Sequence, residues 1–135
     1  MTHVSQMLET NPTALALDRE TLARCIEECF TCAQTCTACA DACLGEDQVA
    51  ELRACIRLDL DCADVCMTTG RVLSRQTAFD AELARSVLEA CAEACRRCGA
   101  ECEKHAEHHD HCRVCAEACR RCAEACDDLL AQVGR

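Results

Sequence analysis

The chain has almost none of the large side chains from which protein cores are usually built. It contains no Trp and no Tyr, and only two Phe among 135 residues. It also has a single Pro and four Gly, so there are few positions at which a helix is forced to break. The composition therefore favours one domain of long helices that pack around small side chains.

Positive charge and long apolar runs are also scarce. The formal net charge is −10 at pH 7, so we expect neither a nucleic-acid partner nor an acidic membrane partner. No apolar run approaches the roughly 20 residues of a transmembrane helix. The first residues, MTHVSQMLETNPTALAL, lack the charged and apolar regions of a signal peptide, and we therefore expect a cytoplasmic protein.

Cysteine is what the chain has in abundance, with 18 residues. In the segment 25–43, CIEECFTCAQTCTACADAC, successive cysteines are alternately four and three residues apart. Residues at these spacings are neighbours on one face of an α-helix. The segment therefore predicts a helix whose buried stripe consists of thiols, where an ordinary bundle helix carries leucine. In a reducing cytosol, dense cysteine indicates metal or redox chemistry more often than a disulfide scaffold.

The same spacing recurs along the rest of the chain. The octapeptide CAEACRRC occupies 91–98 and again 115–122, so similar helices form more than one wall of the interior. We expect helices at about 18–44, 47–75, 81–106 and 111–132, with Asp18, Asp80 and Asp110 as N-caps and Glu46 opening the second helix. Short connections between long helices predict an all-α, antiparallel up-down-up-down four-helix bundle over 18–135 with a cysteine-lined core. Residues 1–17 would form a short N-terminal helical arm.

The two ends of this bundle are predicted to differ. In the antiparallel arrangement, the turns near 44–47 and 106–110 lie at the same end, which we call the mouth. Four histidines belong to this end and continue the stripes of the third and fourth helices: His105, His108, His109 and His111. The opposite end collects leucine and valine. We therefore predict a polar, ligand-bearing mouth and an apolar closed end.

One carboxylate interrupts the stripe of the second helix. Asp59 lies four residues after Cys55 and three before Cys62, which is a core position. A buried carboxylate is costly without a partner, and a metal ion, a histidine or an arginine would satisfy it. Both a metal-associated role and a plain ion pair remain open at this point.

The pattern fits Cu(I) better than other soft metals. Zinc needs four donors in a tetrahedron, and iron–sulfur clusters are usually wrapped by loops, whereas these thiols are spread along rigid helices. Cu(I) needs only two or three sulfurs, and bridging thiolates allow about one ion per cysteine, on the order of 18 ions. The expected ligands are every cysteine, the mouth histidines and Asp59: Cys25, Cys29, Cys32, Cys36, Cys39, Cys43, Cys55, Cys62, Cys66, Cys91, Cys95, Cys98, Cys102, Cys112, Cys115, Cys119, Cys122, Cys126, His105, His108, His109, His111 and Asp59.

Two rival interpretations use the same thiols. One is a zinc or mixed-metal sequestering protein like metallothionein. The other is a thiol oxidoreductase that uses Cys-x-x-Cys pairs. A redox pair usually lies at a helix N-terminus beside a strand, where the dipole lowers a thiol pKa, whereas these pairs lie within helices and no strand is predicted.

The helical CxxxC and CxxC stripes, the repeated CAEACRRC and the histidines near 105–111 resemble those of the cytosolic copper storage proteins, over about residues 18–132. The resemblance implies a four-helix bundle that holds many Cu(I) ions and assembles as a homotetramer. It also implies that copper enters at the histidine end, and that the role is storage or detoxification, not catalysis. The expected partners are copper ions and a protein that donates or accepts copper.

Overall fold

The structure is a computed structural model that describes residues 2–133. Its helices are α1 (His3–Thr10), α2 (Arg19–Leu44), α3 (Arg53–Leu73), α4 (Ala81–Glu103) and α5 (Asp110–Leu130), with a short 3₁₀ helix, η1 (Val49–Leu52), before α3. There is no strand within residues 2–133. The prediction of an all-α fold is confirmed.

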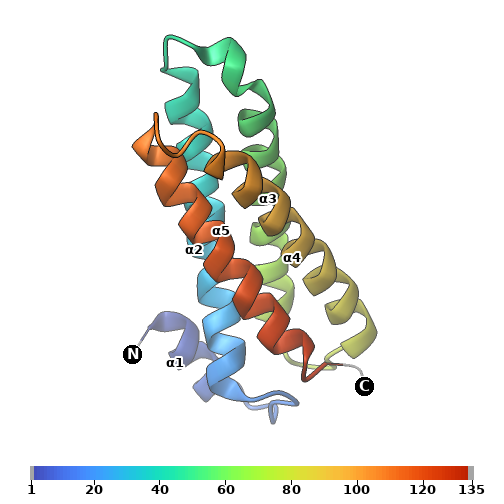
Figure 1. Ribbon diagram of the computed structural model, residues 1–135. Coiled ribbons are helices and arrows are strands. Elements are labelled where there is room, and N and C mark those ends of the chain that lie inside the picture. The colour runs from blue at the N-terminus through green and yellow to red at the C-terminus, as the bar shows by residue number, and fades with distance from the viewer. Residues whose placement is uncertain (1, 134–135) are drawn as a thin grey trace.

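Helices α2 to α5 form an antiparallel four-helix bundle (Figure 1). α2 packs against α3 and α5, and α4 packs against the same two helices. The connections between α2 and α3 and between α4 and α5 lie at the same end, at the top of Figure 1. Each helix thus runs opposite to its neighbours, and the predicted up-down-up-down topology is confirmed. The short α1 lies outside the bundle against α2.

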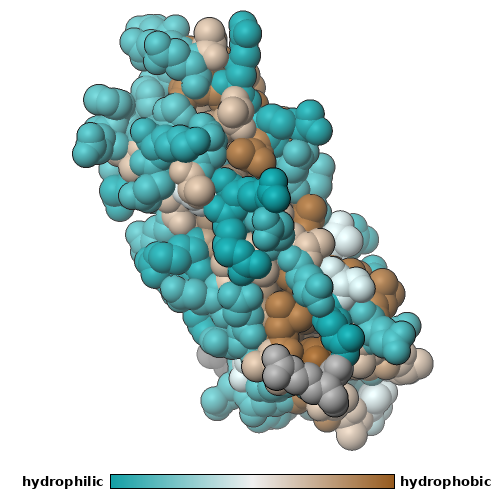
Figure 2. Space-filling model, turned by 45° about the vertical axis from the view of Figure 1, so that its right-hand side comes forward, coloured by the Kyte–Doolittle hydropathy of each residue, from teal (hydrophilic) through white to brown (hydrophobic). Residues whose placement is uncertain are grey.

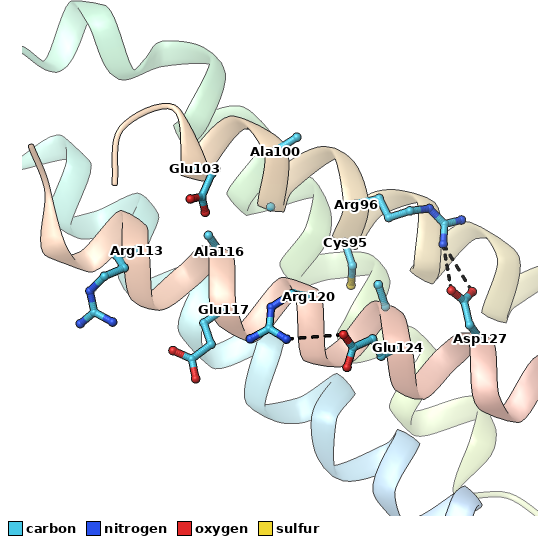
Figure 3. A pocket seen from close by; sticks show the side chains of 12 residues that line it. Cys95, Arg96, Ala100, Glu103, Arg113, Ala116, Glu117, Arg120, Glu124 and Asp127 are labelled. Atoms are coloured by element: carbon cyan, nitrogen blue, oxygen red, sulfur yellow. Dashed lines mark hydrogen bonds and ion pairs between the residues drawn. The ribbon is translucent and has the colours of Figure 1, made fainter. Parts of the chain in front are cut away.

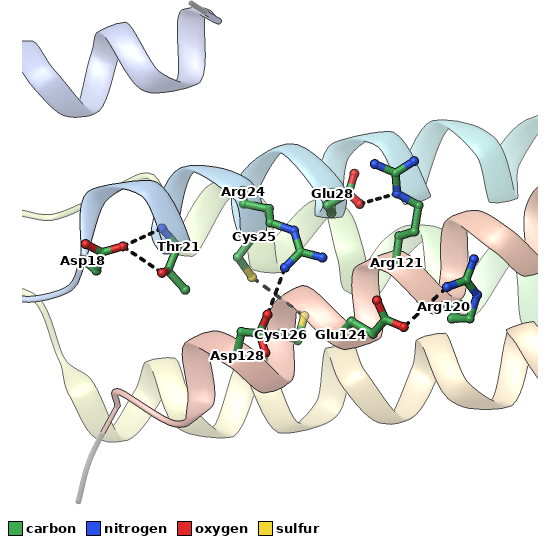
Figure 4. Close-up of polar contacts among 10 residues, drawn as sticks. All are labelled: Asp18, Thr21, Arg24, Cys25, Glu28, Arg120, Arg121, Glu124, Cys126 and Asp128. Atoms are coloured by element: carbon green, nitrogen blue, oxygen red, sulfur yellow. Dashed lines mark hydrogen bonds and ion pairs between the residues drawn. The ribbon is translucent and has the colours of Figure 1, made fainter.

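Two of the three predicted N-caps are present. The Asp18 carboxylate accepts a hydrogen bond from the backbone N–H of Thr21 at 3.0 Å, as Figure 4 shows, and Asp80 accepts one from that of Leu83 at 3.1 Å. The prediction for Asp110 is wrong, because α5 begins at Asp110 itself and the preceding residue, His109, occupies the cap position. The Asp110 carboxylate instead pairs with Arg113 one turn later, at 2.8 Å.

The connection from α2 to α3 differs from the continuous second helix that we predicted. α2 ends at Leu44, and the backbone N–H groups of Gly45 and Glu46 bond to carbonyls three residues back, which tightens the last turn. The chain then forms η1 and enters α3 at Arg53, with the buried Leu52 anchoring the start of α3. Glu46 therefore lies in a connection at the mouth and not in a helix.

Leucines close the opposite end of the bundle, which we call the closed end. Each of the four bundle helices contributes a leucine that is fully buried there: Leu22, Leu73, Leu88 and Leu129. α1 covers α2 beside this end through the buried Leu8. Gly70 permits a close approach between α2 and α3, because a Cβ at this position would lie 2.8 Å from the Phe30 ring.

The outer surface of the bundle is largely hydrophilic on the face drawn in Figure 2. Among residues 2–133, no helix combines the length and apolar character that crossing a bilayer requires. Polar side chains therefore dominate the face drawn in Figure 2, over a bundle whose inside is lined by sulfur.

Candidate metal-binding core

All 18 cysteines point into the bundle and are buried as free thiols. They are 0–2% exposed. The shortest distances between sulfur atoms are 3.5 Å, which join Cys66 to Cys95 and Cys55 to Cys102. A disulfide would bring two sulfurs to about 2.05 Å, so these are contacts between thiols and not bonds.

The sulfur atoms form a nearly continuous row along the bundle axis. At the closed end, Cys25 of α2 faces Cys126 of α5 with their sulfurs 3.9 Å apart, as drawn in Figure 4. Further along, Cys91 Sγ lies 3.9 Å from Cys29 Sγ and 3.7 Å from Cys66 Sγ. Because these three contacts join four different helices, the row depends on the whole bundle and not on any single helix.

Groups of four donor atoms recur along this row, each with its atoms within 4.8 Å of one another. Consecutive groups share members. In the order in which the next sentence names them, Cys122 belongs to the first and second groups, Cys32 to the second and third, and both Cys36 and Cys119 to the third and fourth. Four of these groups are Cys29–Cys91–Cys122–Cys126, Cys32–Cys66–Cys95–Cys122, Cys32–Cys36–Cys62–Cys119 and Cys36–Cys98–Cys115–Cys119. A thiolate that belongs to two groups is placed to bridge two metal ions.

Asp59 lies inside this row, with no exposed surface. Its Oδ1 accepts hydrogen bonds from the thiols of Cys98 at 3.1 Å, Cys115 at 3.2 Å and Cys102 at 3.5 Å. Within residues 2–133, Asp59 forms no ion pair with a histidine or an arginine. Its partners are the candidate metal ligands themselves.

This environment changes the acidity of Asp59. Burial and, to a smaller extent, charge repulsion from the nearby Cys115 sulfur together raise the pKa of the carboxyl to about 8. The metal-free core thus holds the proton of Asp59 under conditions in which an exposed aspartate has lost it. A metal ion next to Asp59 would favour the ionised form and displace this proton.

At the mouth, His111 joins the row of thiols. Its Nδ1 lies 3.5 Å from Cys39 Sγ and 3.6 Å from Cys112 Sγ. Together with Cys43 these atoms form a further compact group of four donors. Burial raises the pKa of Cys43 and raises that of Cys112 to about 11, so both thiols keep their protons at neutral pH until a metal displaces them.

Two of the other mouth histidines contact carboxylates. The Nδ1 of His109 is 2.9 Å from Glu46 Oε2, and the Nε2 of His105 is 3.1 Å from Glu101 Oε2. The His108 side chain is exposed. Of the four predicted mouth ligands, only His111 has its hydrogen-bonding contacts with cysteine sulfur.

Two carboxylates near these histidines were not predicted from the sequence. Glu46 contacts both His109 and His111, and hydrogen bonding from His111 holds the pKa of Glu46 below its ordinary value. Glu101, near the end of α4, pairs with His105 in the turn that follows the helix. The sequence could have indicated Glu46 through the topology alone, because an antiparallel bundle brings the connection that contains Glu46 to the same end as the histidines.

The arginines beside the cysteines lie on the outside of the bundle. Figure 3 shows the groove between α4 and α5, where Arg96 pairs with Asp127 and Arg120 with Glu124, while Cys95 lies beneath. On another outer face, Arg24 pairs with Asp128 and Arg121 with Glu28 (Figure 4). These arginine–carboxylate pairs thus lie on the outer surface, and the thiols lie in the core.

The fold and the core together define a helical-bundle protein with a thiol-lined interior. A family model described as "Copper storage protein" matches residues 18–131. The chain therefore belongs to the copper storage protein family.

Solved structures of related proteins agree with this assignment. The copper storage protein Ccsp from Streptomyces lividans, loaded with 10 copper equivalents, is 60% identical, with a TM-score of 0.95 over 96% of this chain and 99% of that one. A cytosolic copper storage protein from the same organism, loaded with five coppers, is 63% identical, with a TM-score of 0.84 over 85% and 96% of the two chains. The Cu(I)-bound copper storage protein BsCsp3 of Bacillus subtilis is 40% identical, with a TM-score of 0.70 over 78% and 94%.

Proposed function

We propose that this protein stores Cu(I) ions inside its bundle, at about one ion per cysteine. The observation that carries the proposal is the row of free, buried thiols in overlapping groups that share Cys32, Cys36, Cys119 and Cys122. A shared thiolate bridges neighbouring ions, so the number of ions can approach the number of sulfurs. The copper-bound relatives support the same interpretation.

Charge balance favours Cu(I) over zinc as the stored ion. Each Cu(I) that replaces a thiol proton leaves the core with unchanged charge, so filling need not bury net charge. Each Zn²⁺ needs about two thiolates for neutrality, which limits a zinc-loaded core to roughly half as many ions. A metallothionein-like zinc store is therefore the second candidate, and stoichiometry distinguishes the two.

We propose all 18 cysteines as ligands, together with His111 at the mouth and Asp59 within the row. His111 is supported by its contacts with Cys39 and Cys112, and Asp59 by its three short contacts with thiols. His105, His108 and His109 would assist transfer of copper between the mouth and a donor or acceptor protein. Copper would pass in and out through this end.

Several further properties belong to the proposal. The storage unit is the bundle from residue 18 onward, with residues 1–17 as an arm outside it. The protein works in the cytoplasm as a homotetramer and has no catalytic activity, in keeping with a family of storage proteins and a relative described as cytosolic.

An anaerobic titration of the reduced protein with Cu(I), against a competing chromophoric chelator, tests the proposal. We expect an endpoint near one ion per cysteine, with about one proton released per ion in unbuffered solution. His3→Ala, which alters an exposed histidine of α1, outside the four-helix bundle, is the matched control and should leave the endpoint unchanged. Saturation at about four ions, or an endpoint equal to that for zinc, would refute Cu(I) storage.

A further inference from the structure

One carboxylate at the mouth lies between two histidines. Oε2 of Glu46 is 2.8 Å from Nε2 of His111 and 2.9 Å from Nδ1 of His109. The two imidazole rings stack, with centroids 5.6 Å apart and planes inclined by 25°. Glu46 belongs to the connection after α2, and the histidines belong to the start of α5 and the residue before it. The carboxylate therefore links the two connections that form the mouth.

These contacts determine where the imidazole protons lie. An ionised carboxylate only accepts hydrogen bonds, so each ring nitrogen that contacts it must carry a hydrogen. In a neutral imidazole only one nitrogen carries a hydrogen, and the other holds a lone pair. In its neutral form, His111 therefore carries its hydrogen on Nε2 and its lone pair on Nδ1. His109 has the opposite arrangement, with its hydrogen on Nδ1 and its lone pair on Nε2.

The tautomer of His111 matters because of what its other nitrogen faces. The Nδ1 lies 3.5 Å from Cys39 Sγ and 3.6 Å from Cys112 Sγ, in the group of four donors that includes Cys43. A lone pair on Nδ1 binds a metal ion among these sulfurs. The alternative tautomer would place a hydrogen there and leave the group without its nitrogen ligand.

We propose that Glu46 is a positioning residue for copper transfer, because its carboxylate selects the His111 tautomer whose Nδ1 lone pair faces Cys39 and Cys112. The same carboxylate gives His109 the opposite tautomer, with a free Nε2. The proposal rests on the proposed function, since it assigns Glu46 a part in loading that store. Carboxylates that orient metal-binding histidines typically contribute 10–100-fold to metal affinity or activity, and a similar effect of about 10-fold or more is expected here.

The tautomers themselves are the first test, and they are measured without copper. Long-range ¹H–¹⁵N spectra of the reduced metal-free protein, at about pH 9 where free imidazole is neutral, distinguish a protonated from an unprotonated ring nitrogen. The His109→Ala and His111→Ala variants assign the two signals. We expect His111 protonated on Nε2 and His109 on Nδ1, and loss of both preferences in Glu46→Ala. Identical tautomers in wild type and Glu46→Ala would overturn the proposal.

The second test follows transfer of Cu(I) from a weak chelator by stopped flow. We expect Glu46→Ala to slow the transfer about 10-fold or more, while the final number of bound ions stays within one of wild type. Asp47→Ala is the matched control, because Asp47 is the next residue and removes the same charge from an exposed side chain at the mouth. Equal slowing by the two variants would show an effect of charge alone and overturn the positioning role.

A mutant cycle completes the test. If Glu46 acts through the two histidines that it contacts, Glu46→Ala slows transfer in the otherwise wild-type protein but has no further effect in the His109→Ala/His111→Ala background. An additional slowing in that background would contradict the proposal. Failure of the wild type to take up many Cu(I) ions would refute the proposed function, whereas the spectra of the metal-free protein still decide whether Glu46 selects the tautomers.

Discussion

The mouth and the closed end are two ends of one set of helices, yet their chemistry is opposite. Leu129 follows Cys126 by three residues at the closed end, and His111 precedes Cys115 by four at the mouth, so both continue the same stripe of α5. The register is constant and only the side chain at each position changes. Apolar side chains therefore seal one end by packing, while polar ones leave donor atoms at the other.

The largest expected effect concerns stability at the closed end. Leu129→Ala should lower the free energy of unfolding by about 3 kcal/mol, because it removes a fully buried side chain and leaves a cavity. The number of Cu(I) ions bound should stay the same. Urea denaturation of the reduced protein measures the change, and Leu130→Ala, at a half-buried neighbour, is the control. An equal loss in both variants would argue against a specific seal at this end.

The corresponding change at the mouth should affect transfer and not folding. His111→Ala removes the nitrogen next to Cys39 and Cys112, and we expect Cu(I) uptake to slow by about 10–100-fold. Its free energy of unfolding should change by less than about 0.5 kcal/mol, as for other partly exposed side chains. Stopped-flow transfer from a chelator measures the rate. The exposed His108→Ala is the control, and a rate as slow as that of His111→Ala would contradict a specific role for His111.

The two halves of the core should also respond differently to pH, because Asp59 lies among thiols of the mouth half. Its pKa is raised to about 8 in the folded protein, so the folded state holds a proton that the unfolded state releases near pH 4. Stability is therefore greatest below the pKa of the unfolded state and falls as pH rises toward 8, by at most about 1.4 kcal/mol per pH unit.

Asp59→Asn should flatten this dependence in the reduced, metal-free protein, as measured by urea denaturation between pH 4 and pH 8. Asp61→Asn, at an exposed residue that pairs with Arg57 on the outer face of α3, is the matched control. It should retain the slope of the wild type. An unchanged slope in Asp59→Asn would mean that Asp59 does not carry the buried proton.

The smallest expected effect compares two helix starts. Asp18→Ala removes a true N-cap at the closed end and should cost about 1 kcal/mol. Asp110→Ala removes a first-turn carboxylate at the mouth that caps no backbone N–H, so we expect a loss of no more than about 0.5 kcal/mol. Thermal or urea unfolding measures both. A larger loss in Asp110→Ala would mean that Asp110 acts as the N-cap of α5, contrary to the structure, in which His109 occupies that position.

The fold was predictable from the sequence because the cysteine spacing reports helical faces directly. Segment 25–43 alone defines a stripe, and the repeat at 91–98 and 115–122 shows that several helices share it. Their short connections then leave an antiparallel bundle as the simplest way to bury every stripe. The core position of Asp59 followed from the same register, but its partners did not, because they come from α4 and α5.

The mouth was less predictable because its residues lie where helices end. All four histidines continue a stripe only if the third and fourth helices run on through them. In the structure α4 ends at Glu103 and turns follow, so His105 and His109 contact carboxylates, whereas His111, in the first turn of α5, contacts the thiols. The conformation of the connection after Leu44 likewise decides where Glu46 lies, and no periodic pattern encodes such a connection.

The most direct test of copper storage in the core is diffraction from the fully Cu(I)-loaded protein at a wavelength where copper scatters anomalously. Storage in the core predicts a chain of copper peaks along the bundle axis, from Cys25 and Cys126 at the closed end to His111 at the mouth, each next to two or more sulfurs. Copper confined to the mouth or the outer surface, with the core thiols still at their metal-free spacing, would contradict storage in the core.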